Sequence, residues 1–132
     1  MTDIPKGVVL SCSGKKLTSD EINFFSKINP FGFILFSRNF SSKLQIKELI
    51  KSLKSCTLNK SPLVFVDQEG GRVQRFKGKG FENHPTQYYF GELYKKNPSE
   101  AKDLAYSNAR IISDELKPVS YTHLTLPTKR IV

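Results

Sequence analysis

Residues 61–76, SPLVFVDQEGGRVQRF, decide the fold that we expect for this chain. The four consecutive apolar residues at 63–66 are typical of a strand buried on both faces, as in a parallel sheet. The run ends at two carboxylates, Asp67 and Glu69, and a glycine pair and two arginines follow. In α/β folds, ligands bind at the carboxyl ends of parallel strands. We therefore expect a polar binding site directly after this strand.

Two further apolar runs lie upstream, at 6–12 and 31–36, and each predicts a strand. The second run is again almost continuously apolar, which favours a buried parallel strand. Between them, Thr18 and Glu21 have the spacing of a capping box and mark the start of a helix. This helix is expected to end before Pro30, because the residue that precedes a proline disfavours helical geometry.

A second helix is predicted after Ser42, which repeats the capping-box spacing with Gln45. A third helix is expected over 97–117, with a cap, then a proline, then an acid at its start. Strands and helices therefore alternate, which predicts right-handed parallel crossovers. The second helix carries four apolar residues at the spacing of a helix laid on a sheet: Ile46, Leu49, Ile50 and Leu53.

Two motifs connect this pattern to a known family. Residues 66–75, VDQEGGRVQR, resemble the signature of family 3 glycoside hydrolases, in particular the bacterial β-N-acetylhexosaminidases, and residues 32–39, GFILFSRN, resemble a second segment of that family. The resemblance covers 7–117 and implies a (β/α)8 TIM barrel, a fold of about 250 residues. The expected fold class is thus α/β, with 1–117 supplying about three βα units of an incomplete barrel. A barrel completed by a separate chain stays open as an alternative.

The resemblance also implies roles for residues of the first motif. Asp67 and Arg75 are expected to bind the non-reducing sugar, because a carboxylate accepts hydrogen bonds from adjacent hydroxyls and a guanidinium donates in a fixed fork. Six further residues are candidates for shaping the site: Glu69, Gly70, Gly71, Arg72, Arg38 and Asn39.

Each of these six residues also has a purely local interpretation. Glu69 and Arg72 can form an ion pair with each other or hold their loop. Arg38 and Asn39 can anchor the loop that follows them. The glycine pair lets the backbone pass close to the sugar ring or to a neighbouring strand.

The activity implied by the resemblance is a retaining exo-β-N-acetylhexosaminidase that removes terminal N-acetylglucosamine, typically from muropeptides in cytoplasmic cell-wall recycling. A retaining mechanism needs a nucleophile and an acid/base group. In the family these are an aspartate and a histidine, both expected beyond residue 117, so we assign no catalytic residue here and expect the chain alone to be inactive. No metal or cofactor is expected. A β-glucosidase-like member of the same family is the alternative enzyme.

Composition suggests a competing class of function. The formal net charge of +9 is that of a polyanion-binding module. The basic residues are scattered, however, and we expect neither a nucleic-acid nor a membrane partner. Cys12 and Cys56 lack metal-ligand spacing and are expected to be reduced, buried thiols. His84 stands in an extended stretch and is expected at the surface.

Residues 118–132 differ from the rest of the chain. PVSYTHLTLPT resembles the translation of a transposase-end sequencing adapter. We therefore expect a non-native tail in which His123, Lys129 and Arg130 have no functional role, and in which no further strand of the alternation follows.

Overall fold

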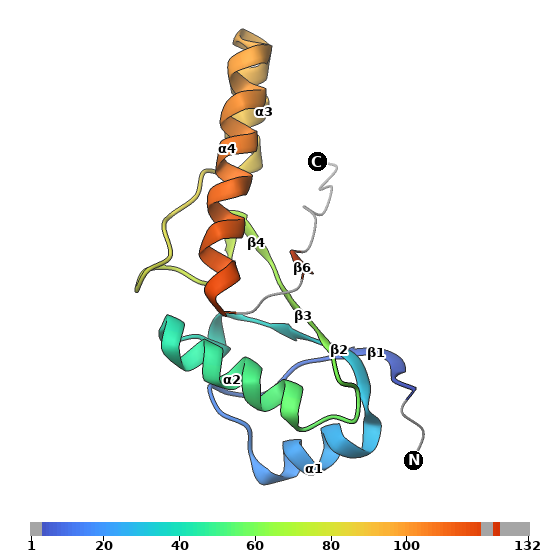
Figure 1. Ribbon diagram of the computed structural model, residues 1–132. Coiled ribbons are helices and arrows are strands. Elements are labelled where there is room, and N and C mark those ends of the chain that lie inside the picture. Colours follow the sequence, from blue (N-terminus) through green and yellow to red (C-terminus); the bar gives the residue numbers. More distant parts are fainter. Residues whose placement is uncertain (1–3, 120–122, 125–132) are drawn as a thin grey trace.

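The computed structural model describes residues 4–119 and 123–124. Three strands alternate with two helices in the first half of the chain (Figure 1). The alternation predicted from the sequence is thereby confirmed, and a short 3-10 helix, η1 (Ser37–Asn39), is added after the second strand. In chain order the main elements are β1 (Lys6–Leu10), α1 (Ser19–Ile28), β2 (Pro30–Leu35), α2 (Lys43–Ser55) and β3 (Leu63–Val66).

The main sheet is parallel throughout, with the strand order β1-β2-β3-β6. Leu35 of β2 pairs with Val66 of β3, so these two strands end at the same level. The expectation that no strand follows is wrong, because β6 (His123–Leu124) pairs with the free edge of β3, where unpaired backbone groups offer hydrogen bonds. Residues 120–122 and 125–132 of the proposed tail lie outside the described part of the chain.

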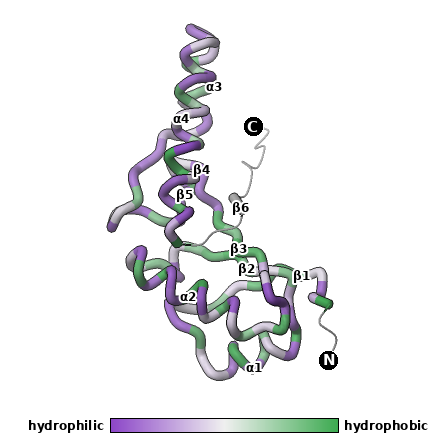
Figure 2. Tube along the Cα trace, in the orientation of Figure 1, coloured by the Kyte–Doolittle hydropathy of each residue, from purple (hydrophilic) through white to green (hydrophobic). Residues whose placement is uncertain are grey.

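The hydrophobic core lies between the sheet and α2. Helices α1 and α2 lie on the same side of the strands (Figure 1), and the apolar colour in Figure 2 concentrates on the strands and on one side of α2. All four residues of the predicted apolar stripe of α2 are buried, as expected. They belong to one cluster with residues of α1, β2 and β3: Phe25, Phe33, Leu35, Val64 and Val66.

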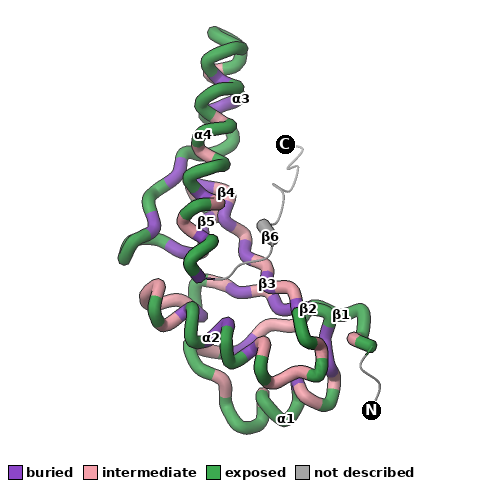
Figure 3. Tube along the Cα trace, viewed as in Figure 1, coloured by how far each residue is buried: buried purple, intermediate pink, exposed green. Residues whose placement is uncertain are grey.

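The prediction that the strands are buried on both faces is wrong for the described residues. Val64 and Val66 are fully buried, but Phe65 between them is only partly buried. On the same face as Phe65, Val9 of β1 is 44% exposed and Ile34 of β2 is only partly buried. Because α1 and α2 both cover the same face, the other face stays partly open to solvent, and Figure 3 colours parts of the strands as intermediate or exposed.

The chain after β3 departs most from the sequence-based expectation. It forms a short antiparallel hairpin, β4 (Gln68–Gly70) with β5 (Val73–Gln74), and then two helices that pack on each other and project from the sheet (Figure 1). The helix α4 (Pro98–Leu116) confirms the predicted third helix, whereas α3 (Gln87–Lys96) was not predicted. Of the helices in the described part of the chain, none is long and apolar enough to cross a membrane.

Candidate functional site

Asp67 directly follows β3, and the β4–β5 hairpin turns the chain back so that Arg75 lies beside it. The Nη2 atom of Arg75 donates a hydrogen bond to Oδ2 of Asp67 at 3.1 Å. The backbone N–H of Arg75 also donates to the Asp67 carbonyl oxygen at 3.3 Å. The structure therefore brings together, at the carboxyl end of a parallel strand, the two residues that the family resemblance assigns to sugar binding.

Both side chains of this ion pair remain within reach of solvent. The exposed fractions are 31% for Arg75 and 22% for Asp67. An ion pair exposed to this extent stabilises a fold by only about 0–1 kcal/mol. Its chemistry suits a polar ligand better, because the carboxylate accepts and the guanidinium donates hydrogen bonds in a fixed orientation. Nε of Arg75 is buried and has no hydrogen-bond partner in the described part of the chain.

Two buried glutamines fix the backbone that carries Arg75. The Oε1 atom of Gln68 accepts from the backbone N–H groups of Arg75 and Phe76, at 3.0 and 3.1 Å. The Nε2 atom of Gln74 donates to the carbonyl oxygens of Phe76 and Glu82, at 3.0 and 2.6 Å. Sequence analysis missed both glutamines. Burial satisfied by backbone hydrogen bonds is the expected state of a polar side chain inside a protein, but no local signal distinguishes these two from surface residues.

The glycine pair fits the hairpin against the segment that precedes α3. Gly70 and Gly71 have φ values of 96° and 60°, which side chains with a Cβ rarely adopt. A Cβ on Gly70 would lie 2.0 Å from the Pro85 carbonyl oxygen, and one on Gly71 would lie 2.2 Å from Cγ2 of Thr86. The close approach is therefore to a neighbouring segment of the chain, and the glycines shape the site through the backbone.

Glu69 and Arg72 do not form the expected ion pair with each other, and neither belongs to any ion pair among the described residues. Their separation follows from the hairpin register, which pairs Gly70 with Val73 and leaves Arg72 exposed in the turn. The backbone of Glu69 helps to hold the loop, because its carbonyl oxygen accepts from Nε2 of Gln87 at 3.2 Å.

Arg38 and Asn39 anchor a loop, but it is the loop after β1 and not the one that follows them. Arg38 donates through Nη2 to Oγ of Ser11 at 2.9 Å and through Nε to the Cys12 carbonyl oxygen at 3.2 Å. Nδ2 of Asn39 donates to the Gly14 carbonyl oxygen at 2.8 Å. The parallel pairing of β1 and β2 explains the difference, because it places the ends of these strands side by side.

Phe36 is a site residue that sequence analysis did not single out. Its ring centroid lies 4.7 Å from Cζ of Arg38 and 5.8 Å from Cζ of Arg75. Cations attract the face of an aromatic ring over such distances. The ring therefore links the end of β2 to the Asp67–Arg75 pair and helps to orient its guanidinium.

The two cysteines are free thiols, as expected. Burial raises the pKa of Cys12 to about 11, and the nearby Glu21 carboxylate adds to this effect. Burial also raises the pKa of Cys56, which is only partly buried. Neither thiol has the depressed pKa that nucleophilic cysteines show.

His84 is buried, so the expectation of a surface histidine is wrong. Its Nδ1 atom lies 2.9 Å from Oδ1 of Asn108, and its Nε2 atom lies 2.9 Å from Oε2 of Glu115. Both partners come from α4, which could not be placed against His84 from the sequence. Their polar atoms satisfy the imidazole and allow its burial.

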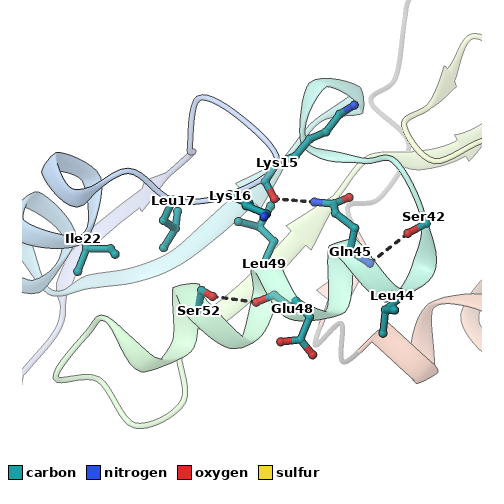
Figure 4. Close-up of a pocket in the computed structure, with 10 residues that line it drawn as sticks. All are labelled: Lys15, Lys16, Leu17, Ile22, Ser42, Leu44, Gln45, Glu48, Leu49 and Ser52. Carbon is teal, nitrogen blue, oxygen red and sulfur yellow. Dashed lines mark hydrogen bonds between the residues drawn. The ribbon is translucent and has the colours of Figure 1, made fainter.

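A groove of about 530 Å³ lies away from the strand ends, between α2 and the segment that runs from Lys15 to Ile22 (Figure 4). Its polar atoms largely bond to one another, since Gln45 donates to the Lys15 carbonyl oxygen and Ser52 to the Glu48 carbonyl oxygen. We assign the candidate site to Asp67 and Arg75 because charged groups converge there, whereas the groove is mostly an apolar gap between neighbouring helices.

Comparison with known proteins identifies relatives of this chain. The chain is 36% identical over 110 residues to a β-hexosaminidase of Xylella fastidiosa and 38% identical over 109 residues to one of Actinobacillus pleuropneumoniae. Each match covers 83% of this chain but only 32% and 31% of the relative. The chain thus spans about a third of the length of the curated relatives it matches.

Solved structures of related proteins also match the chain. The fold matches native NagZ from Neisseria gonorrhoeae with a TM-score of 0.84 and 32% identity, over 94% of this chain and 37% of that one. It also matches a glycoside hydrolase family 3 β-N-acetylglucosaminidase from Paenibacillus with a TM-score of 0.77 and 25% identity, over 90% of this chain and 22% of that one. No protein-family model matches the chain. Over most of its own length, the chain is therefore similar in sequence to about a third of two β-hexosaminidases and similar in fold to part of NagZ and of a glycoside hydrolase family 3 β-N-acetylglucosaminidase.

Proposed function

We propose that the chain forms the first three βα units of a (β/α)8 barrel and carries part of its sugar-binding site. The Asp67–Arg75 pair at the carboxyl end of β3 is the observation that carries this proposal. In such barrels the catalytic and ligand-binding residues lie at the carboxyl ends of the strands, and the helices cover only the outer face of the sheet. Val9, Ile34 and Phe65 share the face away from the helices and are exposed or only partly buried, which is consistent with a second face that lines a barrel interior.

The substrate class that we propose is a glycan with a terminal β-linked N-acetylglucosamine, in particular the muropeptide fragments of cytoplasmic cell-wall recycling. Two findings support it: the relatives are named β-hexosaminidases, and NagZ from Neisseria gonorrhoeae has been solved in complex with N-trifluoroacetyl-D-glucosamine. In our proposal, Asp67 accepts hydrogen bonds from adjacent hydroxyls of the terminal sugar, and Arg75 donates to its ring substituents.

Hydrolysis itself needs groups that the proposed three units do not supply. A retaining glycosidase requires a nucleophile and a group that acts first as acid and then as base. The family resemblance places the aspartate and the histidine with these roles beyond residue 117. We therefore propose that this chain binds the sugar but does not turn over a chromogenic β-N-acetylglucosaminide by itself.

A titration of the ¹⁵N-labelled chain with N-acetylglucosamine tests the proposal. We expect saturable shifts of the amide signals over 67–76. Asp67→Asn and Arg75→Lys should each weaken binding about tenfold or more. Asp67→Asn removes the charge from a charge-assisted hydrogen bond of about 1.5–3 kcal/mol, and Arg75→Lys removes the planar fork of donors. Arg72→Lys is the matched control, since this exposed arginine of the same hairpin has no assigned ligand contact.

The same titration distinguishes the two enzyme classes. A β-N-acetylhexosaminidase site should prefer N-acetylglucosamine over glucose, and a β-glucosidase-like site should not. Shifts that do not saturate with either sugar would refute the proposed site. Both changes keep the positive charge, so an equal loss of affinity for Arg72→Lys and Arg75→Lys would show that the guanidinium of Arg75 has no specific role in binding.

A further inference from the structure

We propose that His84 is a positioning residue for the Asp67–Arg75 site and acts through the backbone of the β4–β5 hairpin. This inference rests on the proposed function of that site and identifies what holds it in place. His84 lies between the hairpin and α4, and it bonds to both of them, through its backbone on one side and its ring on the other.

The ring of His84 is fixed by α4. Its side chain is only 3% exposed, and its two nitrogens lie 2.9 Å from oxygens of Asn108 and Glu115. Glu115 is itself 11% exposed, and its second oxygen accepts from the backbone N–H of Glu82 at 2.8 Å. The imidazole is therefore engaged at both nitrogens, and the segment that carries it is tied to α4 at two points.

The backbone of His84 in turn holds the hairpin. Its N–H donates to Oε1 of Gln74 at 3.0 Å, and its carbonyl oxygen accepts from the N–H of Gly71 at 2.9 Å. One residue thus restrains both the glycine turn and the strand that ends next to Arg75. The carbonyl oxygen of Pro85, at the following position, fills the space that a Cβ on Gly70 would need.

The restraint reaches the ion pair in two further steps. Gln74 donates to the Phe76 carbonyl oxygen, and Gln68 accepts from the N–H groups of Phe76 and Arg75. Arg75 then reaches Asp67 with Nη2. Since the ring of His84 is buried against α4, its contribution is to hold the hairpin in shape and not to contact the sugar. A change in the ring should therefore loosen the hairpin and weaken sugar binding, while the core around α2 stays intact.

His84→Phe in the full 132-residue chain tests this inference, because phenylalanine fills similar space without either ring nitrogen. We expect the Gly71 amide to exchange its hydrogen about tenfold faster and N-acetylglucosamine to bind about tenfold more weakly, since the substitution breaks hydrogen bonds in a buried network. Amides of α2 should exchange as in the wild type. Asp114→Asn is the matched control on α4, because this exposed carboxylate pairs only with Lys117 in the described structure.

Variants of the two α4 residues that bond to the His84 ring test the same inference. Glu115→Gln keeps an oxygen acceptor and should bind the sugar within about threefold of wild type, whereas Glu115→Leu removes the acceptor and should behave like His84→Phe. If His84→Phe unfolds the chain, Asn108→Ala replaces it, because that change removes one ring partner and leaves His84 in place. It should then speed exchange at Gly71 but not in α2.

Two results would overturn the inference: unchanged exchange at Gly71 together with unchanged sugar affinity, or faster exchange that is equal in α2 and in the hairpin. A wild-type chain that binds no N-acetylglucosamine would refute the proposed function instead. In that case, faster amide exchange in His84→Phe that is confined to 67–76 would still show that His84 restrains the hairpin. The failure of the proposed function and the failure of this inference are therefore distinguishable.

Discussion

The substitution Gly70→Ala should destabilise the fold more than any other glycine-to-alanine change considered for this chain. Two features of the Gly70 position are incompatible with alanine. Its φ of 96° is a conformation that L side chains rarely adopt, and a Cβ there would lie 2.0 Å from the Pro85 carbonyl oxygen. A separation this short must be relieved by moving the hairpin away from the segment before α3.

The expected magnitude follows from these two properties. Backbone strain at a non-glycine residue in this region costs about 1–3 kcal/mol. Moving the hairpin also breaks the hydrogen bond from the Gly71 N–H to the His84 carbonyl oxygen, 2.9 Å long in the native state, which contributes about 1 kcal/mol. Together the free energy of unfolding should fall by about 2–4 kcal/mol.

Urea denaturation of the full chain, followed by circular dichroism, measures this effect. Gly78→Ala is the matched control, because Gly78 has a φ of 65° but no atom within 4 Å of the added Cβ, so it should lose only about 1–2 kcal/mol. Gly7→Ala has neither strain nor a close neighbour and should change stability by about 0.5 kcal/mol or less. A loss for Gly70→Ala no larger than that for Gly78→Ala would refute the argument from close approach.

Three further predictions concern the α1 region and the thiols. Thr18→Ala removes the cap of α1 and should lower the free energy of unfolding by about 1 kcal/mol in the same urea assay. Partial burial alone would raise the pKa of Glu21, but hydrogen bonds from Thr18 and Ser13 outweigh it and lower the pKa below 4.5. The stability that Glu21 contributes is therefore present at neutral pH and lost as the pH falls below 4.5. Glu21→Gln should flatten this part of the acid denaturation curve, and an unchanged curve would contradict the prediction. Iodoacetamide should label Cys56 before Cys12, since Cys12 is buried with a pKa of about 11, and equal rates by peptide mass spectrometry would count against this order.

Features set by neighbours in the chain could be predicted from the sequence. The helix starts at Thr18 and Asn97 depend on side chains that bond to backbone groups three residues ahead. The buried stripe of α2 depends only on helical spacing. Asp67 and Arg75 were singled out because of a family resemblance, and the geometry of their ion pair follows from a hairpin that the sequence analysis did not predict.

Features set by distant contacts could not be predicted. His84 is buried because Asn108 and Glu115 contact its ring. These two residues lie 24 and 31 positions further along the chain, and nothing near His84 in the sequence indicates the contact. Arg38 bonds back to the loop after β1 for the same reason, 26 and 27 positions away. The apolar run of β3 predicted burial correctly on the helix side only, since a hydrophobic pattern does not say which face another layer will cover.

A chimaera tests the central claim most directly. Residues 4–117 would replace the matching third of the Actinobacillus pleuropneumoniae β-hexosaminidase, and hydrolysis of a chromogenic β-N-acetylglucosaminide would be measured. If the chain forms the sugar-binding units of such a barrel, the chimaera should hydrolyse the substrate, and Asp67→Asn within it should lower kcat/KM about a hundredfold, as the loss of a buried charged contact to substrate does. A folded chimaera without activity, or an active one in which Asp67→Asn makes no difference, would contradict the account.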